Sequence, residues 1–381
     1  MTGVNCMKIM KLVHCLLLLT VLFAFPCSDA TADHLPVLID TSRPLINDRI
    51  ITVKSSNDVQ ALRKTLIQFL WGSSGFPQGK LPSSVQYKVQ SPVRNLANLR
   101  QVDTLHIAMG SGLKGLAHHF IPKKKNKRLV VLHLGHSENC TFDDGNPAEP
   151  DTGMRKTLQR LLHEGFSVLA VYMPLITPEN CRWGHDQLFT LSTTGNPMKF
   201  FVETTVVGLN YMQQNFSEYR DFSMIGLSGG GWATTLYAAL DPRIKVSIPV
   251  AGSLPLYLSW GISRGDTEQN YDNLYRLAGY PDLYVLGAAG PGRRQIQVLN
   301  RYDDCCFGES QHNPAAAKMP YATAVRGYES HVKSALKQIG SGTFDVVIDE
   351  SANRHMISAF NIENVIIPAL RRGFQPKKPG Q

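Results

Sequence analysis

The chain alternates short apolar runs with longer amphipathic stretches, and this pattern predicts strands separated by helices. Apolar runs typical of buried strands lie at 101–109, 116–121, 128–134, 166–173, 221–227, 244–251, 295–299 and 344–348. Amphipathic stretches that predict helices lie at 59–71, 153–163, 198–211, 232–240 and 357–370. The first two strands are joined by a glycine-rich turn and are expected to pair. Strands that alternate with helices in this way predict an α/β fold, with a mostly parallel central sheet flanked by helices.

The chain carries no low-complexity linker and no internal repeat, so we expect one large domain over residues 96–381. Residues 33–95 hold one amphipathic stretch followed by glycine- and proline-rich sequence. They are too short to bury a sizeable core alone, and we expect an N-terminal extension that packs on the large domain. Residues 252–292 form a long, aromatic-rich segment, which suggests a small lid.

The N-terminal segment has the features of a signal peptide. Lys8 and Lys11 form a weakly basic start, and an apolar run over 15–25 follows. This run is too short to span a bilayer, which needs about 20 apolar residues, and small residues come after it. We interpret residues 1–32 as a signal peptide cleaved near Ala30 or Ala32. The mature protein would then be periplasmic or extracellular without a stable membrane anchor; an uncleaved anchor is the alternative.

The charge balance is basic, with 39 Lys and Arg against 30 Asp and Glu, or +9 at pH 7. Cleavage after residue 32 would remove two lysines and one aspartate and leave +8. Such a charge raises the local concentration of anionic partners, including acidic glycans. The one dense basic run, Lys123–Arg128, lies between two predicted strands and is typical of a solvated turn. Aromatic and basic residues are not interleaved, so we expect no nucleic-acid partner.

Four cysteines remain after the expected cleavage: Cys140, Cys181, Cys305 and Cys306. An even number in an exported protein suggests disulfides, and three pairings are open. Cys140 and Cys181 could pair if their loops lie above neighbouring strands, whereas a bond between the adjacent Cys305 and Cys306 would be strained. Reduced thiols are the alternative, and the cysteine spacings resemble no metal site. Asn139 and Asn215 begin glycosylation sequons, which matter only in a host that glycosylates exported proteins.

The most informative motif is Gly226-Leu227-Ser228-Gly229-Gly230, which follows a predicted strand and opens a predicted helix. A strand, tight turn and helix form the context that a G-x-S-x-G nucleophile requires. The glycines keep side chains out of a turn too sharp for bulky neighbours. The hydroxyl would project from the strand end, with backbone N–H groups of the helix N-terminus facing a developing oxyanion. The motif therefore predicts a nucleophilic serine.

A serine nucleophile needs a base, and the base needs an acid to orient it. Asp303 and Asp304 follow the predicted strand 295–299, and His355 follows the predicted strand 344–348. In parallel sheets the carboxyl ends of the strands carry the chemistry. We therefore expect Ser228, His355 and one of the two aspartates to meet there.

The chain order of Ser228, Asp303 and His355, each after its own strand, resembles the α/β-hydrolase family over roughly residues 95–372. The resemblance favours Asp303 over Asp304 as the acid, because it leads the turn at the strand end. It also implies an oxyanion hole formed by the backbone N–H of Gly229 and a second amide. The segment from His133 to Ser137 resembles the family's His-Gly loop but lacks its repeated glycines, and we assign the second amide to His136.

These residues predict a secreted serine hydrolase that cleaves a small-molecule or glycan-linked carboxylic ester through an acyl-enzyme. No metal or organic cofactor is expected. The long excursion over 174–197 lies on the predicted catalytic side, where Trp183 and His185 are candidate substrate contacts. Two alternatives stay open, a serine peptidase or amidase of the same fold and a non-catalytic binding module.

Overall fold

The structure is a computed structural model that describes residues 50–136, 140–142, 151–178, 180–181, 185–219, 221–258, 266–313 and 318–373. Contacts divide the chain into two units, Met1–Leu38 and Ile39–Gln381, and all described residues belong to the second. The expected signal peptide and the candidate Trp183 lie outside the described residues. In the part that is described, no helix combines the length and apolarity needed to cross a bilayer.

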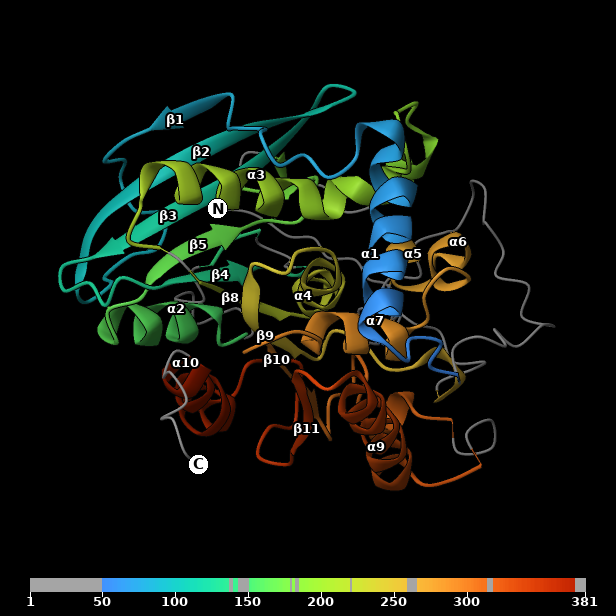
Figure 1. Cartoon of the computed structure of the whole chain (residues 1–381). Coiled ribbons are helices and arrows are strands. Elements are labelled where there is room, and N and C mark those ends of the chain that lie inside the picture. Colours follow the sequence, from blue (N-terminus) through green and yellow to red (C-terminus); the bar gives the residue numbers. More distant parts are fainter. Residues whose placement is uncertain are drawn as a thin grey trace, which may run out of the picture. The chain divides into compact units, whose positions relative to one another are not determined.

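The described residues form a nine-stranded sheet in the order β1-β2-β3-β5-β4-β8-β9-β10-β11 (Figure 1). Its strands are β1 (Ser84–Gln86), β2 (Leu99–Gly110), β3 (Leu113–Pro122), β4 (Leu129–His133), β5 (Ser167–Val171), β8 (Phe222–Leu227), β9 (Ile244–Val250), β10 (Arg294–Asn300) and β11 (Thr343–Asp349). The pairs β1–β2, β2–β3 and β3–β5 are antiparallel, and the pairs from β5 to β11 are parallel. The mostly parallel sheet and its opening hairpin are therefore confirmed.

The apolar runs form strands because both faces of the sheet are buried. In β4, Leu129 and Val131 belong to the core on one face, whereas Val130 and Leu132 belong to the core on the other. Successive side chains of a strand point to opposite faces, so a strand covered on both sides needs apolar residues at every position.

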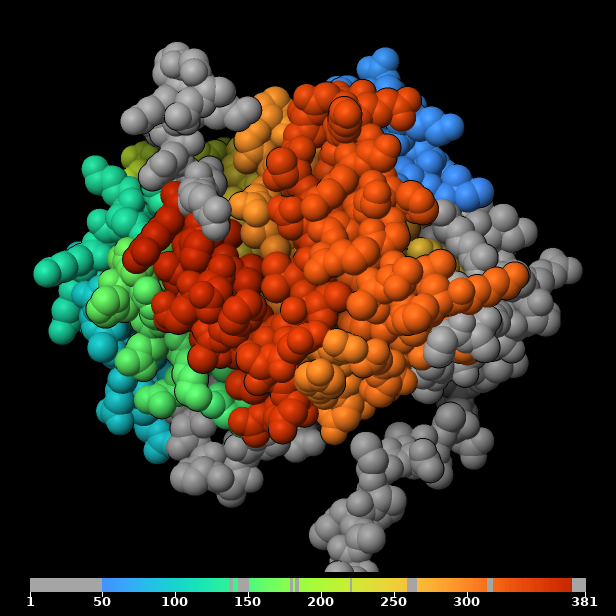
Figure 2. All heavy atoms as spheres, turned by 90° about the horizontal axis from the view of Figure 1, so that it is seen from below, coloured from blue at the N-terminus to red at the C-terminus, as the bar shows by residue number. Residues whose placement is uncertain are grey.

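Helices cover the two faces unequally (Figure 1). One core contains residues of α1 (Ser56–Trp71), α3 (Phe200–Asn215), α4 (Gly229–Leu240), α7 (Tyr280–Ala288) and α9 (Tyr321–Ile339). The other contains residues of α2 (Met154–His163), the π-helix η7 (Asn361–Ile366) and α10 (Ile367–Gly373). Figure 2 shows the C-terminal part of the chain, coloured orange to red, which forms much of the surface on the side of α9 and α10.

The segment before the sheet is tied to the core by α1 and by Asp282. A capping box begins α1: the Ser55 side chain accepts from the Asp58 N–H, and Asp58 accepts from the Ser55 N–H. The buried Asp282 of α7 accepts hydrogen bonds from the Thr52 N–H and hydroxyl, at 2.8 and 2.9 Å. Residues 84–86 of the expected extension form β1 and pair with β2, so they belong to the sheet itself. A packing extension over residues 33–95 therefore stays a prediction for the residues before β1.

The helices α9 and α7 differ from the sequence expectation. The helix α9 was not predicted, although Tyr321, Val325, Tyr328 and Val332 recur at intervals of four, three and four and are buried. The helix α7 falls inside the segment proposed as a lid, but all its residues are buried and it joins β9 to β10. Residues 280–288 are therefore part of the core, and a lid remains a prediction only for the residues before them.

The closing helical segment is a π-helix, η7, followed by α10, where a single helix was expected. Pro368 lies in the first turn of α10 and has no N–H to donate to the preceding turn.

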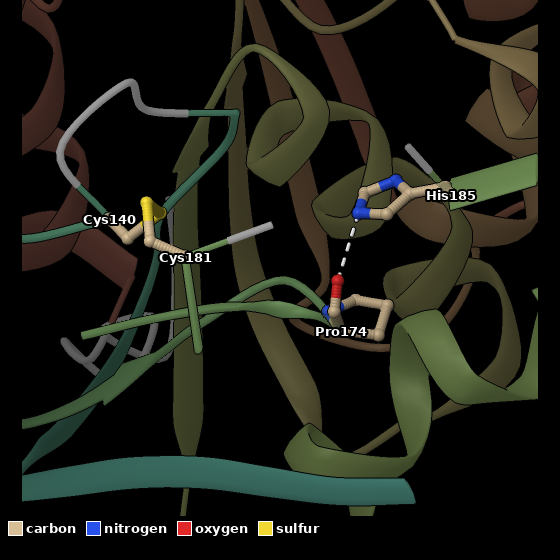
Figure 3. Close-up of a disulfide and its surroundings, with 4 residues drawn as sticks. All are labelled: Cys140, Pro174, Cys181 and His185. Carbon is tan, nitrogen blue, oxygen red and sulfur yellow. Dashed lines mark hydrogen bonds between the residues drawn. A yellow bond between two sulfur atoms is a disulfide. The ribbon is translucent and has the colours of Figure 1, made fainter. Parts of the chain in front are cut away.

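Cys140 and Cys181 form a disulfide, one of the pairings that the sequence left open (Figure 3). Cys140 follows β4, and Cys181 belongs to the short hairpin of β6 (Ile176–Thr177) and β7 (Asn180–Cys181) after β5. The bond links the loops above two neighbouring strands, as the pairing requires. Cys305 and Cys306 are free thiols.

Candidate active site

Ser228 lies at the junction of β8 and α4 in a conformation that few residues adopt. Its φ is 59° and its ψ is −127°, and α4 begins at the next residue. Such a backbone conformation costs about 1–3 kcal/mol for a residue other than glycine and persists only where its surroundings enforce it. The serine is 7% exposed. The local structure is thus the strained turn that the glycine motif predicts.

The neighbouring glycines are required by close backbone contacts. A Cβ on Gly226 would lie 2.1 Å from the carbonyl oxygen of Gly230, and a Cβ on Gly230 would lie 2.2 Å from that of His133. Both separations are far below van der Waals contact, so the turn packs against itself and against the end of β4. Larger side chains at these positions would displace the turn that holds Ser228.

His355 and Asp303 form a hydrogen bond at the carboxyl ends of β10 and β11. The Nδ1 of His355 lies 2.6 Å from Oδ2 of Asp303. The other oxygen, Oδ1, accepts from the N–H groups of Cys305 and Cys306 at 2.9 and 3.0 Å, and Asp303 is fully buried. A carboxylate only accepts, so Nδ1 carries the proton and Nε2 of His355 is left as a base. The adjacent Asp304 is exposed, and Asp303 is the aspartate that contacts His355.

Electrostatics favour a charged imidazole at this position. Burial lowers the pKa of His355, but the hydrogen bond and the charge of Asp303 outweigh burial, so that the pKa is raised above its usual value of 6.5. The same pair stabilises the imidazolium that a general base becomes when it takes a proton.

Hydrogen bonds connect the turn of Ser228 to the strand ends that precede Asp303 and His355. Its N–H donates to Val250 O at the end of β9 (3.0 Å), and Ala251 N–H donates to Val298 O in β10 (2.9 Å). Farther along, the side-chain amide of Asn300 donates to Met356 O at 2.7 Å. Among the described residues Nε2 of His355 has no hydrogen-bond partner, so the Ser228 hydroxyl does not bond to it in this structure. Catalytic hydrogen bonds often tighten only when substrate is bound.

The loop after β4 lies directly against the turn of Ser228. A Cβ on Gly135 would lie 2.8 Å from Cβ of Ser228 and 3.0 Å from the nitrogen of Gly229. A Cβ on Gly229 would in turn lie 2.7 Å from Cε1 of His136. N–H groups in the first turn of a helix have no acceptor within the helix. The two segments expected to supply the oxyanion donors are therefore in contact.

The side chain of His136 belongs to a polar cluster that the sequence did not predict. Its Nε2 lies 3.2 Å from Nδ1 of His185 and 3.4 Å from Oε1 of Glu268, and its Nδ1 lies 3.1 Å from Oδ2 of Asp266. The Nε2 of His185 lies 2.9 Å from the carbonyl oxygen of Pro174 (Figure 3). The contacts of His185, proposed from sequence as a substrate residue, are thus with this cluster, and its side chain is 1% exposed.

Two free thiols lie beside the candidate triad. A hydrogen bond with Cys306 lowers the pKa of Cys305 to about 7, against the opposing effect of burial and with a further contribution from His355. Nitrogen and sulfur atoms of Cys305, Cys306 and His355 lie within 4.8 Å of one another. Oxidation or alkylation of these thiols would therefore change the surroundings of the His355 imidazole.

A hollow of about 630 Å³ lies elsewhere on the described surface, beside Pro242 and Arg243. These residues directly precede β9, so the hollow is at the amino ends of the parallel strands, whereas the candidate triad is at the carboxyl ends. None of the candidate catalytic residues lines it.

Solved structures with this fold include several esterases. The methylesterase BT1017 is 16% identical over 83% of this chain and 64% of its own, with a TM-score of 0.56. A glucuronoyl esterase from Solibacter usitatus is 13% identical over 88% and 96%, and one from Teredinibacter turnerae is 16% identical over 87% and 89%; both have TM-scores of 0.55. The sequence matches no family model and no curated protein. At these identities the likeness shows the fold: the chain has the α/β-hydrolase fold that the sequence predicted.

Proposed function

We propose that this chain is an exported serine hydrolase that cleaves carboxylic esters through Ser228, His355 and Asp303. The observation that carries the proposal is the hydrogen bond between Asp303 and His355, at the sheet edge where the strained turn holds Ser228. A turn of this kind is costly to maintain, and such strain is concentrated at functional sites. The disulfide between Cys140 and Cys181 supports export, because such bonds persist in oxidising compartments.

In the proposed mechanism, Nε2 of His355 takes the proton of the Ser228 hydroxyl as the serine oxygen attacks the ester carbonyl. The N–H groups of Gly229 and His136 donate to the oxyanion that forms. His355 then gives its proton to the leaving alcohol. In the second half of the reaction His355 takes a proton from water, the water oxygen attacks the acyl carbonyl, and His355 returns the proton to the oxygen of Ser228 as the acid leaves. Asp303 keeps the proton on Nδ1 and stabilises the imidazolium.

We propose carbohydrate-linked esters as the substrate class. The fold neighbours named as glucuronoyl esterases and as a methylesterase support this choice, at the level of the fold. The net charge of +8 expected after cleavage also favours anionic polymers, whose local concentration it would raise. If charge contributes, kcat/KM on an acidic glycan ester should fall as ionic strength rises, whereas kcat/KM on a neutral ester should not.

The test is hydrolysis of p-nitrophenyl acetate by the wild type and by the Ser228→Ala variant. The variant should lose hydrolysis above the uncatalysed rate while keeping the wild-type unfolding temperature, and Ser223→Ala in the same strand is the matched control. Wild-type turnover in Ser228→Ala would remove the proposal. A panel of acetyl, methyl-glucuronoyl and feruloyl esters, with the corresponding amides, separates an esterase from an amidase. No turnover of any member would favour a binding module.

A further inference from the structure

The cluster of His136, His185 and Glu268 has the composition and the geometry of a metal site. The three residues come from the connections after β4, β5 and β9, with His185 at the start of a 3-10 helix (His185–Thr190) and Glu268 in α5 (Thr267–Asn270). Each offers one ligand atom, and these atoms lie close together. The atoms are Nε2 of His136, Nδ1 of His185 and Oε1 of Glu268, with mutual distances of 3.2, 3.4 and 3.5 Å. They therefore form a nearly equilateral triangle.

The size of this triangle matches one face of a zinc tetrahedron. Zinc–nitrogen and zinc–oxygen bonds of about 2.0–2.1 Å at tetrahedral angles place the ligand atoms about 3.3–3.4 Å apart. An octahedral metal with bonds of similar length would bring neighbouring ligands to about 3.0 Å. The observed distances fit the tetrahedral case better. Two imidazoles and one carboxylate are also a ligand set typical of zinc.

The outer contacts of both histidines leave their inward nitrogens as acceptors. A carbonyl oxygen only accepts, so the hydrogen bond of His185 to Pro174 O puts the proton on Nε2 and leaves a lone pair on Nδ1 (Figure 3). The contact of His136 Nδ1 with Asp266 places a proton on Nδ1 of that ring. A metal ion would then take the place of the proton that Nε2 of His136 shares with Nδ1 of His185. Metal-ligating histidines characteristically donate their second N–H to a carboxylate or a backbone carbonyl.

Glu268 supplies the strongest argument for a cation. Its side chain is fully buried, and neither of its oxygens accepts a hydrogen bond from any described residue, although two imidazole nitrogens lie at 3.4 and 3.5 Å. A buried carboxylate without hydrogen bonds is costly, and buried charges are typically paired or coordinate metals. The competing arrangement is a protonated His136 that pairs with Glu268 and Asp266 without any metal.

We propose that His136, His185 and Glu268 bind one zinc ion, with Asp266 and Pro174 O orienting the two imidazoles. Three protein ligands leave a fourth position for water or a substrate oxygen. The ion would also join the loop of His136, which touches Gly229, to the segment of Glu268. The proposal does not depend on the ester chemistry. The site could not be predicted from the sequence, because the cysteines are not involved and the ligands share no local spacing.

The test is the metal content of the full-length protein after zinc loading and gel filtration, measured by inductively coupled plasma mass spectrometry. The wild type should retain about one zinc per chain. The variants His185→Ala and Glu268→Gln should each retain less than about a tenth of that, and His331→Ala, which changes an exposed histidine of α9, should match the wild type. Retention of zinc in both ligand variants would overturn the assignment, as would a zinc-loaded wild type that holds no metal.

Variants of buried residues can fail to fold, so the wild type provides a second measurement. Protein stripped with a chelator should bind one equivalent of zinc in a calorimetric titration, and its unfolding temperature should rise with zinc concentration. Cobalt in place of zinc should give the intense visible bands of a tetrahedral site. A stripped wild type that binds no zinc, with an unfolding temperature independent of zinc, would mean that a protonated His136 holds the cluster together.

Discussion

The substitution Asp303→Asn tests the pairing of acid and base with little change in shape. The N–H groups of Cys305 and Cys306 lie 2.9 and 3.0 Å from Oδ1 of Asp303, and the side-chain oxygen of an asparagine can still accept from both. Its NH₂ group would then face Nδ1 of His355, now 2.6 Å from a carboxylate oxygen. Because an NH₂ group only donates, it would favour the tautomer with the proton on Nε2. That tautomer cannot take a proton from Ser228.

The expected loss can be worked from this geometry. An imidazolium and a carboxylate with charge centres about 3.5–4 Å apart attract by about 4–5 kcal/mol at an effective dielectric constant of about 20. The loss of this attraction in the transition state lowers the rate by about 10³–10⁴, since each tenfold is about 1.4 kcal/mol. The wrong tautomer in other serine hydrolases costs about 10⁴ in kcat, in agreement with the electrostatic figure.

The assay is kcat/KM on p-nitrophenyl acetate between pH 5 and 9, with the unfolding temperature as the folding check. In the wild type kcat/KM should rise with pH through a pKa above 6.5, because His355 must be neutral to act and Asp303 raises its pKa. The exposed Asp304→Asn is the matched control and should keep the wild-type rate and pH profile. A folded Asp303→Asn within tenfold of the wild type, or an equal loss in Asp304→Asn, would refute the reasoning.

Three further predictions concern stability and reactivity. Removal of the disulfide by the double substitution Cys140→Ser and Cys181→Ser, which opens a sequence separation of 41, should lower the free energy of unfolding by about 4 kcal/mol in urea titrations; an unchanged midpoint would contradict the pairing. Burial lowers the pKa of His119 to about 3, so between pH 6.5 and that value the unfolded chain binds more protons and stability falls with falling pH. Between pH 6.5 and 5 the free energy of unfolding should therefore decrease by about 2 kcal/mol less in His119→Phe than in the wild type. An identical pH dependence in the two proteins would argue against a neutral buried imidazole. Iodoacetamide should alkylate Cys305, whose pKa is about 7, faster at pH 8 than at pH 6, and the alkylated enzyme should be inactive. The variant Cys305→Ser should keep its activity in the same reagent. Full activity of the wild type after stoichiometric alkylation would contradict the place of Cys305 beside the imidazole.

Most of the sheet could be predicted because buried parallel strands leave a clear apolar signal. The runs at 128–134 and 221–227 became β4 and β8 with ends shifted by one residue at most. The helix α9 was missed although its apolar positions have helical spacing. The length and aromatic content of 252–292 suggest a lid, but α7 within it is buried all round. A helix covered on every side has no polar face that would reveal it in the sequence.

The candidate triad could be predicted for a related reason. Ser228, Asp303 and His355 each follow a recognisable strand, so the order of elements along the chain places them at one edge of the sheet. Glu268 offered no such signal, since it lies in a long connection whose path depends on tertiary packing. Its contacts with His136 and His185 join segments far apart in sequence.

Covalent labelling by a fluorophosphonate tests the central claim most directly, since the probe reacts with an activated serine and requires no knowledge of the substrate. The account predicts one adduct per chain, found by mass spectrometry on the peptide that contains Ser228. The adduct should be absent in Ser228→Ala and strongly slowed in His355→Ala. Folded wild-type protein that takes up no probe, or that carries the adduct on another residue, would contradict the account.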